Sequence, residues 1–325
     1  MGTTIILDIY RKKICTFASL NLHRFSNLFV RNKTKIMNIA IYSRDVKEVH
    51  RALFLSLIDF LKNNEIPFTI FSEVAKKLTE YKFEQIYEDR SSLILQKPDL
   101  LICMGGDGTM LDTVILTKDT DIPVLGVNLG RLGFLANTNK EELFQTITHF
   151  VNGKYEIEER MLLEVNSNIP IFINENIALN DLTFLRANSS SMIEVKVYAN
   201  GEFLNNYFAD GLIIATSTGS TGYSLSCGGP ILHPKSHNFV ITPIAPHNLN
   251  IRPIVMPDDV ILSFEIKGRT PEFLCTLDSR LAYITSNHLI SVKKAKNTFK
   301  ILNVKDNSFL EALKYKLHWG NQNIF

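Results

Sequence analysis

An apolar run that leads through a glycine-rich loop into a helical pattern limits the folds open to this chain. The run is Leu100–Met104, the loop is Gly105-Gly-Asp-Gly108, and residues 109–116 continue as a helix. In such a turn at the carboxyl end of a parallel strand, backbone N–H groups can approach phosphate oxygens, and the helix N-terminus adds partial positive charge. The stretch predicts an open α/β sheet with a phosphate site at its edge.

The carboxylate of Asp107 is unexpected in a phosphate-binding loop, because it repels phosphate. Its presence makes sense if it acts as a base toward a hydroxyl, as a magnesium ligand, or as both. The alternative is a plain hairpin turn, since Asp-Gly is a common hairpin dipeptide. From Thr109 onward, however, the sequence lacks the alternation of a hairpin strand. The loop is not a Walker loop, and no GxGxxG motif occurs.

The first part of the chain alternates strand and helix patterns. This order favours a parallel, doubly wound, Rossmann-like α/β domain. The predicted strands are 39–42, 67–71, 100–103 and 123–127, and the predicted helices are 47–63, 109–116 and 141–151.

Past about residue 155 the pattern becomes mostly β, with a hairpin turn expected at Asn200-Gly201. Ser308 and Glu311 form a capping-box signature that opens a final helix, which we expect to pack back on the body. Further apolar runs lie at 193–198, 212–215, 239–242, 260–266 and 281–285. We therefore predict an α/β domain at 37–157 plus 303–325 and a β-rich domain at 158–302.

The length, net charge and cysteine content of the chain limit its domain number and the kinds of partner it can bind. The 325 residues suggest two domains, and the formal net charge of +2 gives no field that would attract nucleic acid or a membrane. The four cysteines form no CxxC pair, so we expect reduced thiols in a cytoplasmic protein. No apolar run approaches the ~18 residues that span a bilayer.

Residues 1–36 differ from the rest in being basic and poor in acids. We expect an upstream start or a disordered tail, because Met37 precedes a natural first strand. An organelle transit peptide is the alternative.

A second unusual stretch is the apolar strand 210–215, which opens into hydroxyl and glycine residues at 216–226. Hydroxyls both donate and accept hydrogen bonds, which suits phosphate and ribose oxygens. A flexible Gly/Ser linker is the alternative, but apolar residues flank the stretch on both sides.

Several blocks together resemble the NAD kinase family. GGDGT (105–109) is shared with lipid kinases and phosphofructokinases, so the other blocks carry the specificity. They are NLGRLGFLA (128–136), ALND (178–181), DGLIIATSTGSTGYSLS (210–226), GGPILHP (228–234), PIAPHNLNIRP (243–253) and KLHWG (316–320). The resemblance covers residues 37 to 325.

The resemblance implies transfer of a phosphoryl group from ATP to the 2′-hydroxyl of the adenosine ribose of NAD, giving NADP. It implies that Asp107 is catalytic. It also implies that Mg²⁺ or another divalent cation binds with the nucleotide, and Asp107 is the one side chain suggested as its ligand. Asn180 and Asp181 would contact the nicotinamide ribose, Tyr223 would offer a stacking face, and Ala245 and His247 would reach in from a neighbouring subunit. The implied phosphate-binding residues are Gly105, Gly106, Gly108 and Thr109. The implied NAD-binding residues are Asp107, Gly108, Phe134, Asn180, Asp181, Asp210, Thr218, Ser220, Thr221, Gly222, Tyr223, Ser224, Leu225, Ser226, Ala245 and His247.

Some assignments have structural alternatives: Asp181 as a turn cap, Asp210 as a hairpin corner, and Ala245 as a packing residue. Arg280 stands where family members often carry an amide, which puts dinucleotide contacts there in question; it would alternatively add a cation near a phosphate. The rival functions are a GGDGT-type lipid kinase and a non-catalytic nucleotide sensor. The resemblance also implies a homodimer or homotetramer; ATP against polyphosphate as donor, NADH acceptance and feedback stay open.

Overall fold

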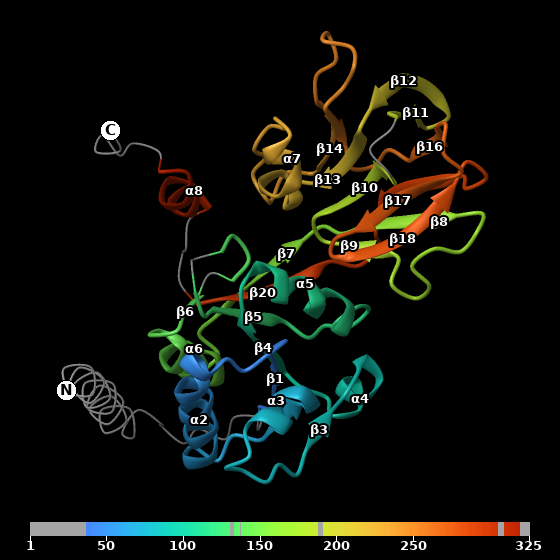
Figure 1. Cartoon of the computed structure of the whole chain (residues 1–325). Helices are drawn as coiled ribbons and strands as arrows, with labels where there is room; N and C mark the ends of the chain where they lie inside the picture. The colour runs from blue at the N-terminus through green and yellow to red at the C-terminus, as the bar shows by residue number, and fades with distance from the viewer. Residues whose placement is uncertain (1–36, 131–132, 137, 188–190, 305–308, 319–325) are drawn as a thin grey trace, which may run out of the picture.

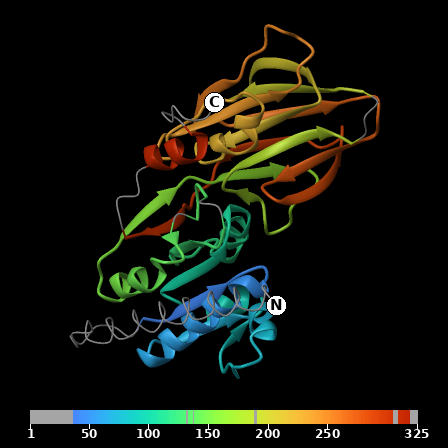
Figure 2. The same ribbon diagram turned by 60° about the vertical axis from the view of Figure 1, so that its left-hand side comes forward.

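The computed structural model describes residues 37–130, 133–136, 138–187, 191–304 and 309–318. They form two halves, a sheet flanked by helices and a larger region of packed antiparallel strands, as Figures 1 and 2 show from two sides. The predicted segment 1–36 and the capping residue Ser308 lie outside the described residues.

The first half is built on a sheet with the order β3-β2-β1-β4-β5-β20-β7, in which β6 also pairs with β5. All its pairings are parallel except that of β20 with β7. The strands are β1 (Ile39–Tyr42), β2 (Phe68–Phe71), β3 (Ile86–Tyr87), β4 (Leu100–Gly105), β5 (Val124–Asn128), β6 (Thr138–Asn139), β7 (Glu156–Arg160) and β20 (Phe299–Asn303).

Helices cover both faces of this sheet, as alternation along β1 requires. Ile39 and Ile41 pack into the core under α2, α3 and α6, whereas Ala40 and Tyr42 face the core under α4 and α5. The helices are α2 (Glu48–Asn63), α3 (Ser72–Lys77), α4 (Arg90–Leu95), α5 (Asp107–Leu116) and α6 (Leu143–Val151).

The strand order reverses between β1 and β4. The chain leaves β1 toward β2 on one side, and β4 continues to β5 on the other, so their crossover helices α2 and α5 cover opposite faces. The carboxyl ends of two such strands open a crevice, the usual ligand site of open α/β sheets. The glycine loop after β4 lies at this crevice.

The second half is a sandwich of two six-stranded sheets, β15-β14-β13-β10-β17-β18 and β12-β11-β16-β19-β8-β9. Its core comes from alternate residues of both sheets, such as Phe184, Leu212, Val195 and Phe264. The strands are β8 (Leu163–Ser167), β9 (Ile177–Ala178), β10 (Asp181–Arg186), β11 (Ile193–Ala199), β12 (Glu202–Ala209), β13 (Gly211–Thr216), β14 (Asn238–Ile244), β15 (Ile254–Pro257), β16 (Leu262–Lys267), β17 (Glu272–Leu277), β18 (Arg280–Thr285) and β19 (Ile290–Lys294).

Two chain crossings and a helix join the halves. The strands β7 and β20 belong to the first sheet and lead directly into and out of the sandwich. The last helix, α8 (Phe309–Leu317), lies against both halves: the Phe309 ring is 6.3 Å from that of Phe134 in the first half and 5.3 Å from that of His233 in the second. The expectation that this helix packs back is thereby confirmed.

The fold predicted from the sequence is confirmed: an α/β half with the glycine loop, a mostly β half and a C-terminal helix. The expected turn at Asn200-Gly201 joins β11 to β12, with both residues at positive φ (50° and 84°). The exact domain limits stay a prediction. In the described part of the chain, no helix is long and apolar enough to cross a membrane.

Candidate active site

The glycine loop ends β4 and starts α5. Gly105 is the last residue of the strand, Gly106 is the N-cap, and Asp107 opens the helix, two residues earlier than the sequence pattern predicts. Gly106 and Gly108 are exposed. The first N–H groups of a helix have no partner inside it, so those of α5 are available to an anion at the crevice.

The carboxylate of Asp107 is held by the loop that follows β5. Oδ2 accepts the N–H of Phe134 at 2.8 Å, and Oδ1 accepts those of Leu135 and Ala136, each at 3.0 Å. Gly133 makes this close approach possible, because a Cβ at that position would overlap Oδ1. The carboxylate is therefore fixed by backbone groups and stays about one-third exposed, at 34% of its side chain.

Two basic side chains lie beside the glycine loop, and no role was predicted for either from the sequence. Lys316 of α8 places Nζ 3.5 Å from Oδ2 of Asp107 and 4.0 Å from the Phe134 ring centroid. Arg44, which follows β1, lies beside Gly108 and forms a two-pronged ion pair with Asp112 of α5. No motif predicts these pairings, because they depend on how distant elements fold together.

The hydroxyl-rich stretch forms a compact turn of two short helices, η1 (Gly219–Thr221) and α7 (Tyr223–Ser226), after β13. It is built directly on the Asn180 region. The N–H of Thr216 donates to the Asn180 carbonyl at 2.8 Å, and a Cβ on Gly219 would overlap the same oxygen. The linker alternative is thereby excluded for these residues.

The hydroxyls of this turn divide into two groups. Ser220 and Ser224 are fully buried, and their hydroxyls bond to the Ser217 carbonyl at 2.7 Å and the Thr242 hydroxyl at 2.8 Å, so they hold the turn in shape. Tyr223 is 43% exposed and offers an open ring face. Of the other expected contacts, Ser226 is exposed, Thr221, Gly222 and Leu225 are half-buried, and Thr218 is buried.

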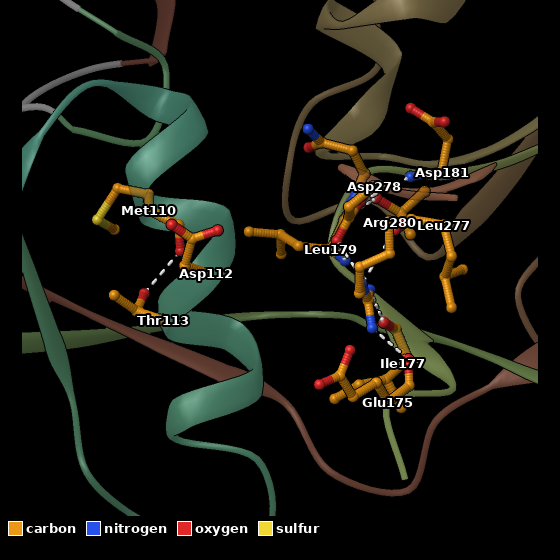
Figure 3. A network of polar contacts seen from close by, with 12 residues as sticks. Met110, Asp112, Thr113, Glu175, Ile177, Leu179, Asp181, Leu277, Asp278 and Arg280 are labelled. Atoms are coloured by element: carbon orange, nitrogen blue, oxygen red, sulfur yellow. Dashed lines mark hydrogen bonds and ion pairs between the residues drawn. The ribbon is translucent and has the colours of Figure 1, made fainter. Parts of the chain in front are cut away.

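The carboxylate of Asp278 holds the backbone of the Asn180–Asp181 pair; Figure 3 shows Asp278 beside Leu179 and Asp181. This carboxylate accepts the N–H groups of Leu179 at 2.9 Å, Asn180 at 2.8 Å and Asp181 at 3.2 Å. In return, the N–H of Asp278 donates to the Asp181 carbonyl at 3.0 Å. No role was predicted for Asp278 from the sequence; in the folded chain it fixes the backbone of the pair.

Two carboxylates are thus buried side by side. Burial first, and the nearby Asp278 second, raise the pKa of Asp181 to about 7, while a hydrogen bond from Thr183 opposes the shift. Burial also raises the pKa of Asp278, but three backbone N–H groups and the Arg280 guanidinium oppose that rise. Because Asp278 has far more groups that favour its charge, we assign the charge to Asp278 and the titration near neutral pH to Asp181.

Arg280 turns away from any ligand and into the protein. Its guanidinium donates to the carbonyls of Glu175, Ile177 (2.5 Å) and Leu277 (3.1 Å), and one nitrogen lies 3.8 Å from Asp278. Figure 3 shows these bonds below the Asp278 carboxylate. In this arrangement Arg280 binds backbone carbonyls and favours the charged form of Asp278.

The remaining expected residues lie around this centre. Asp210 forms an ion pair with Arg186 at 3.0 Å. The pKa of Tyr223 is raised, first by burial and then by the nearby Cys227, Asp181 and Asp210. Ala245 and His247 are exposed on the loop after β14.

The metal-ligating side chains around the glycine loop suit a metal ion that enters the site bound to a nucleotide. Among the described residues, no three His, Cys, Asp or Glu side chains gather in a group that could hold a metal ion. Magnesium is typically bound through one or two carboxylates together with substrate phosphates and water. Asp107 is the single carboxylate of the loop and fits that role.

Comparisons with known proteins identify a family. The profile of the ATP-NAD kinase N-terminal domain matches residues 32–155, and that of the C-terminal domain matches residues 179–304. An NAD kinase of Cytophaga hutchinsonii is 43% identical over 87% of this chain and 98% of its own length. One of Flavobacterium psychrophilum is 41% identical over the same shares.

Solved structures share the fold. Yeast NADH kinase, determined in complex with NADH, has a TM-score of 0.80 and 24% identity, and the match covers 88% of both chains. An Archaeoglobus fulgidus NAD kinase, determined in complex with ATP, has a TM-score of 0.67 and 24% identity over 87% of this chain and 99% of that one.

Proposed function

This chain belongs to the ATP-NAD kinase family, and from that membership we propose that it transfers the γ-phosphoryl group of ATP to the 2′-hydroxyl of the adenosine ribose of NAD, producing NADP. The observation that supports this most directly is Asp107. A carboxylate oriented by three backbone N–H groups stands at the start of a helix whose free N–H groups suit phosphate. Base and phosphate cradle therefore lie within one helical turn of each other.

In the proposed reaction, the 2′-hydroxyl oxygen forms a bond to the γ-phosphorus as the bond from that phosphorus to the bridging β,γ-oxygen breaks. The bonding pair leaves with ADP, and the hydroxyl proton passes to Asp107 and then to solvent. A positioned base of this kind typically contributes about 10²–10⁴-fold. The N–H groups of Gly106 to Gly108 would face the donor phosphates, with Thr109 beside them.

The NAD site in this proposal is the seam between the hydroxyl turn and the Asn180–Asp181 pair. Asn180 and Asp181 would bind the nicotinamide ribose, and Tyr223 would stack on the dinucleotide. Ser220 and Ser224 support the turn through their buried hydroxyls and would not touch NAD with their side chains. Phe134 would lie on the adenine side, where its N–H already orients Asp107.

Mg²⁺ bound to the donor would neutralise phosphate charge and bring the donor into line. We further propose a cytoplasmic protein, since the described cysteines, Cys103, Cys227 and Cys275, are all free thiols. A homodimer or homotetramer would place the exposed Ala245 and His247 at a neighbouring subunit's site. Neither nucleic acid nor a membrane is a proposed partner.

The test is an incubation of the purified chain with NAD, ATP and magnesium, read by the formation of NADP. Rapid NADP formation supports the proposal. Phosphorylation of a lipid and not of NAD would favour a lipid kinase, and binding of NAD and ATP without turnover would favour a nucleotide sensor. Parallel reactions with polyphosphate and NADH define the donor and acceptor range.

A further inference from the structure

Lys316 reaches the glycine loop from the far end of the chain. Its Nζ lies 3.5 Å from Oδ2 of Asp107 and 4.0 Å from the Phe134 ring centroid. The helix that carries it is anchored by Leu313, which is 4% exposed, and by the contacts of Phe309 with the rings of Phe134 and His233. The ammonium group is therefore positioned by packing and is not a loose surface charge.

The contacts of Asp107 show what this position means. An ionised carboxylate offers about four acceptor sites. Three are taken by backbone N–H groups at 2.8–3.0 Å, which belong to the consecutive residues 134–136. The fourth is taken by Lys316 at the longer distance of 3.5 Å, through a flexible four-carbon side chain. The position that a ribose hydroxyl must take on Asp107 is thus the one that Lys316 fills.

The reaction also requires a cation that the loop does not itself supply. Negative charge is spread over the phosphoryl oxygens during transfer, next to the negative Asp107. Arg44 lies near Gly108, but its guanidinium is already joined to Asp112 by two hydrogen bonds. Among the described residues, the ammonium of Lys316 contacts Asp107 and the Phe134 ring, so it can turn to the phosphoryl oxygens when the hydroxyl takes its place.

We propose that Lys316 is a catalytic residue. Its ammonium balances Asp107 before the substrates bind, gives up that contact to the incoming 2′-hydroxyl, and then contacts the oxygens of the phosphoryl group in transfer. Lys316 keeps its protons throughout, and none of its own bonds forms or breaks. The inference rests on the proposed function, since it concerns the same site.

The experiment compares three variants of the full chain: Lys316→Met, Lys316→Arg and Lys314→Met. Lys314 lies on the same helix with an exposed side chain, so its variant is the matched control. The assay measures kcat, the KM values for NAD and ATP, and the thermal unfolding midpoint. Loss of one preorganised cation from a transition state is expected to lower kcat about 10²-fold in Lys316→Met.

The other readouts separate catalysis from structure. A half-exposed ion pair contributes about 0–1 kcal/mol to folding, so the unfolding midpoint of Lys316→Met should stay within about 3 °C of wild type. We expect the KM for NAD to change less than about threefold, Lys316→Arg to recover kcat to within about tenfold, and Lys314→Met to match wild type. A kcat of Lys316→Met within twofold of wild type would overturn the proposal.

A double variant covers the case in which Lys316→Met also loosens α8. If the Lys316 ammonium only pairs with the Asp107 carboxylate, it has no partner in an Asp107→Asn background. Adding Lys316→Met to that background should then lower kcat no further. An ammonium that contacts the phosphoryl group should cause a further loss of kcat of about tenfold. No further loss would overturn the proposal. A wild-type chain that makes no NADP would instead overturn the proposed function, which keeps the two failures distinct.

Discussion

Two aspartates of this molecule, Asp107 and Asp181, show how differently one side chain is treated in its two halves. Asp107 stands at the open end of a parallel sheet, about one-third exposed, with its oxygens bound by three N–H groups and an ammonium. Asp181 lies in the seam of the sandwich, 8% exposed, with the carboxylate of Asp278 as its neighbour. The first environment orients the carboxylate, whereas burial in the second raises the pKa of Asp181.

The contrast teaches that the two carboxylates suit different tasks. Asp107 is prepared as an oriented anion, which is what a proton acceptor needs in phosphoryl transfer. Asp181 is held close to its titration point, so its charge depends on pH in the neutral range. We therefore expect Asp107 to govern turnover and Asp181 to govern the binding of NAD.

The largest effect expected from this contrast is the loss of turnover in Asp107→Asn. An amide keeps one acceptor oxygen for the loop but cannot take the hydroxyl proton, so kcat should fall about 10²-fold or more while the fold is retained. Steady-state kinetics and circular dichroism measure both effects. Asp121→Asn is the control, because Asp121 is 94% exposed and lies in a surface pair with Lys300. A kcat within tenfold of wild type would remove Asp107 from the proposed mechanism.

The next effect concerns the support of the other aspartate, in Asp278→Ala. The change leaves three N–H groups, those of Leu179 to Asp181, without their acceptor. Each buried donor left unbonded costs about 1–3 kcal/mol, so the unfolding midpoint should fall by about 8 °C or more and the KM for NAD should rise about tenfold. Calorimetry and kinetics at saturating ATP give the two values. An unchanged KM in a folded variant would show that the Asn180–Asp181 backbone does not need this support.

Much of the fold was accessible from sequence because local patterns and global structure agree in it. The short apolar run of β1 and the turn residues at Asn200-Gly201 are local signals, and each specified its element. The glycine loop was recognisable for the same reason, since strand, loop and helix are contiguous in the chain. The start of α5 was predicted two residues late because Asp107 and Gly108 are poor helix formers, although the first turn of a helix tolerates them.

The parts of the site that sequence did not predict depend on contacts between distant segments. Lys316 is 209 residues from Asp107, and Asp278 is 98 residues from Asn180. No periodicity or spacing links such partners. Arg280 illustrates the same limit. Its sequence position left open a phosphate contact, and the folded chain brings the carbonyls of Glu175 and Ile177 within reach of its guanidinium.

The pH dependence of the unfolding midpoint in Asp181→Asn tests whether Asp181 is the buried carboxylate that titrates near neutral pH. Burial raises the pKa of Asp181 from its ordinary value of 3.8 to about 7 in the folded chain, so the fold favours its neutral form. Stability from this group is therefore full below pH 4 and is lost as the pH rises from about 4 to about 7. The amide stays neutral, so the variant should match wild type at pH 4 and exceed its unfolding midpoint by several degrees at pH 8.

Binding should show the opposite pH dependence. If the ribose requires the ionised carboxylate, the wild-type KM for NAD falls as the pH rises from 6 to 8, whereas that of Asp181→Asn is higher and nearly flat. Kinetic profiles at fixed ionic strength measure this. A wild-type KM that is flat across this range, or a variant less stable than wild type at pH 8, would contradict the assignment of the titrating group to Asp181.

The smallest effect is expected where the guanidinium of Arg280 is replaced by an amide, in Arg280→Gln. The glutamine side chain can reach one of the three carbonyls that the guanidinium binds, and it removes the positive charge 3.8 Å from Asp278. Losing the charge makes the ionised Asp278 less favourable, which should weaken its hold on Leu179 to Asp181. We expect a midpoint lower by about 3–6 °C and a KM for NAD raised about two- to threefold, with kcat unchanged. Lys293→Gln, at an exposed pair with Glu164 on the opposite sheet, controls for the loss of any one cation. If Arg280→Gln instead lowers kcat and leaves the midpoint intact, the guanidinium acts on the substrate, and the buried aspartate pair does not depend on it.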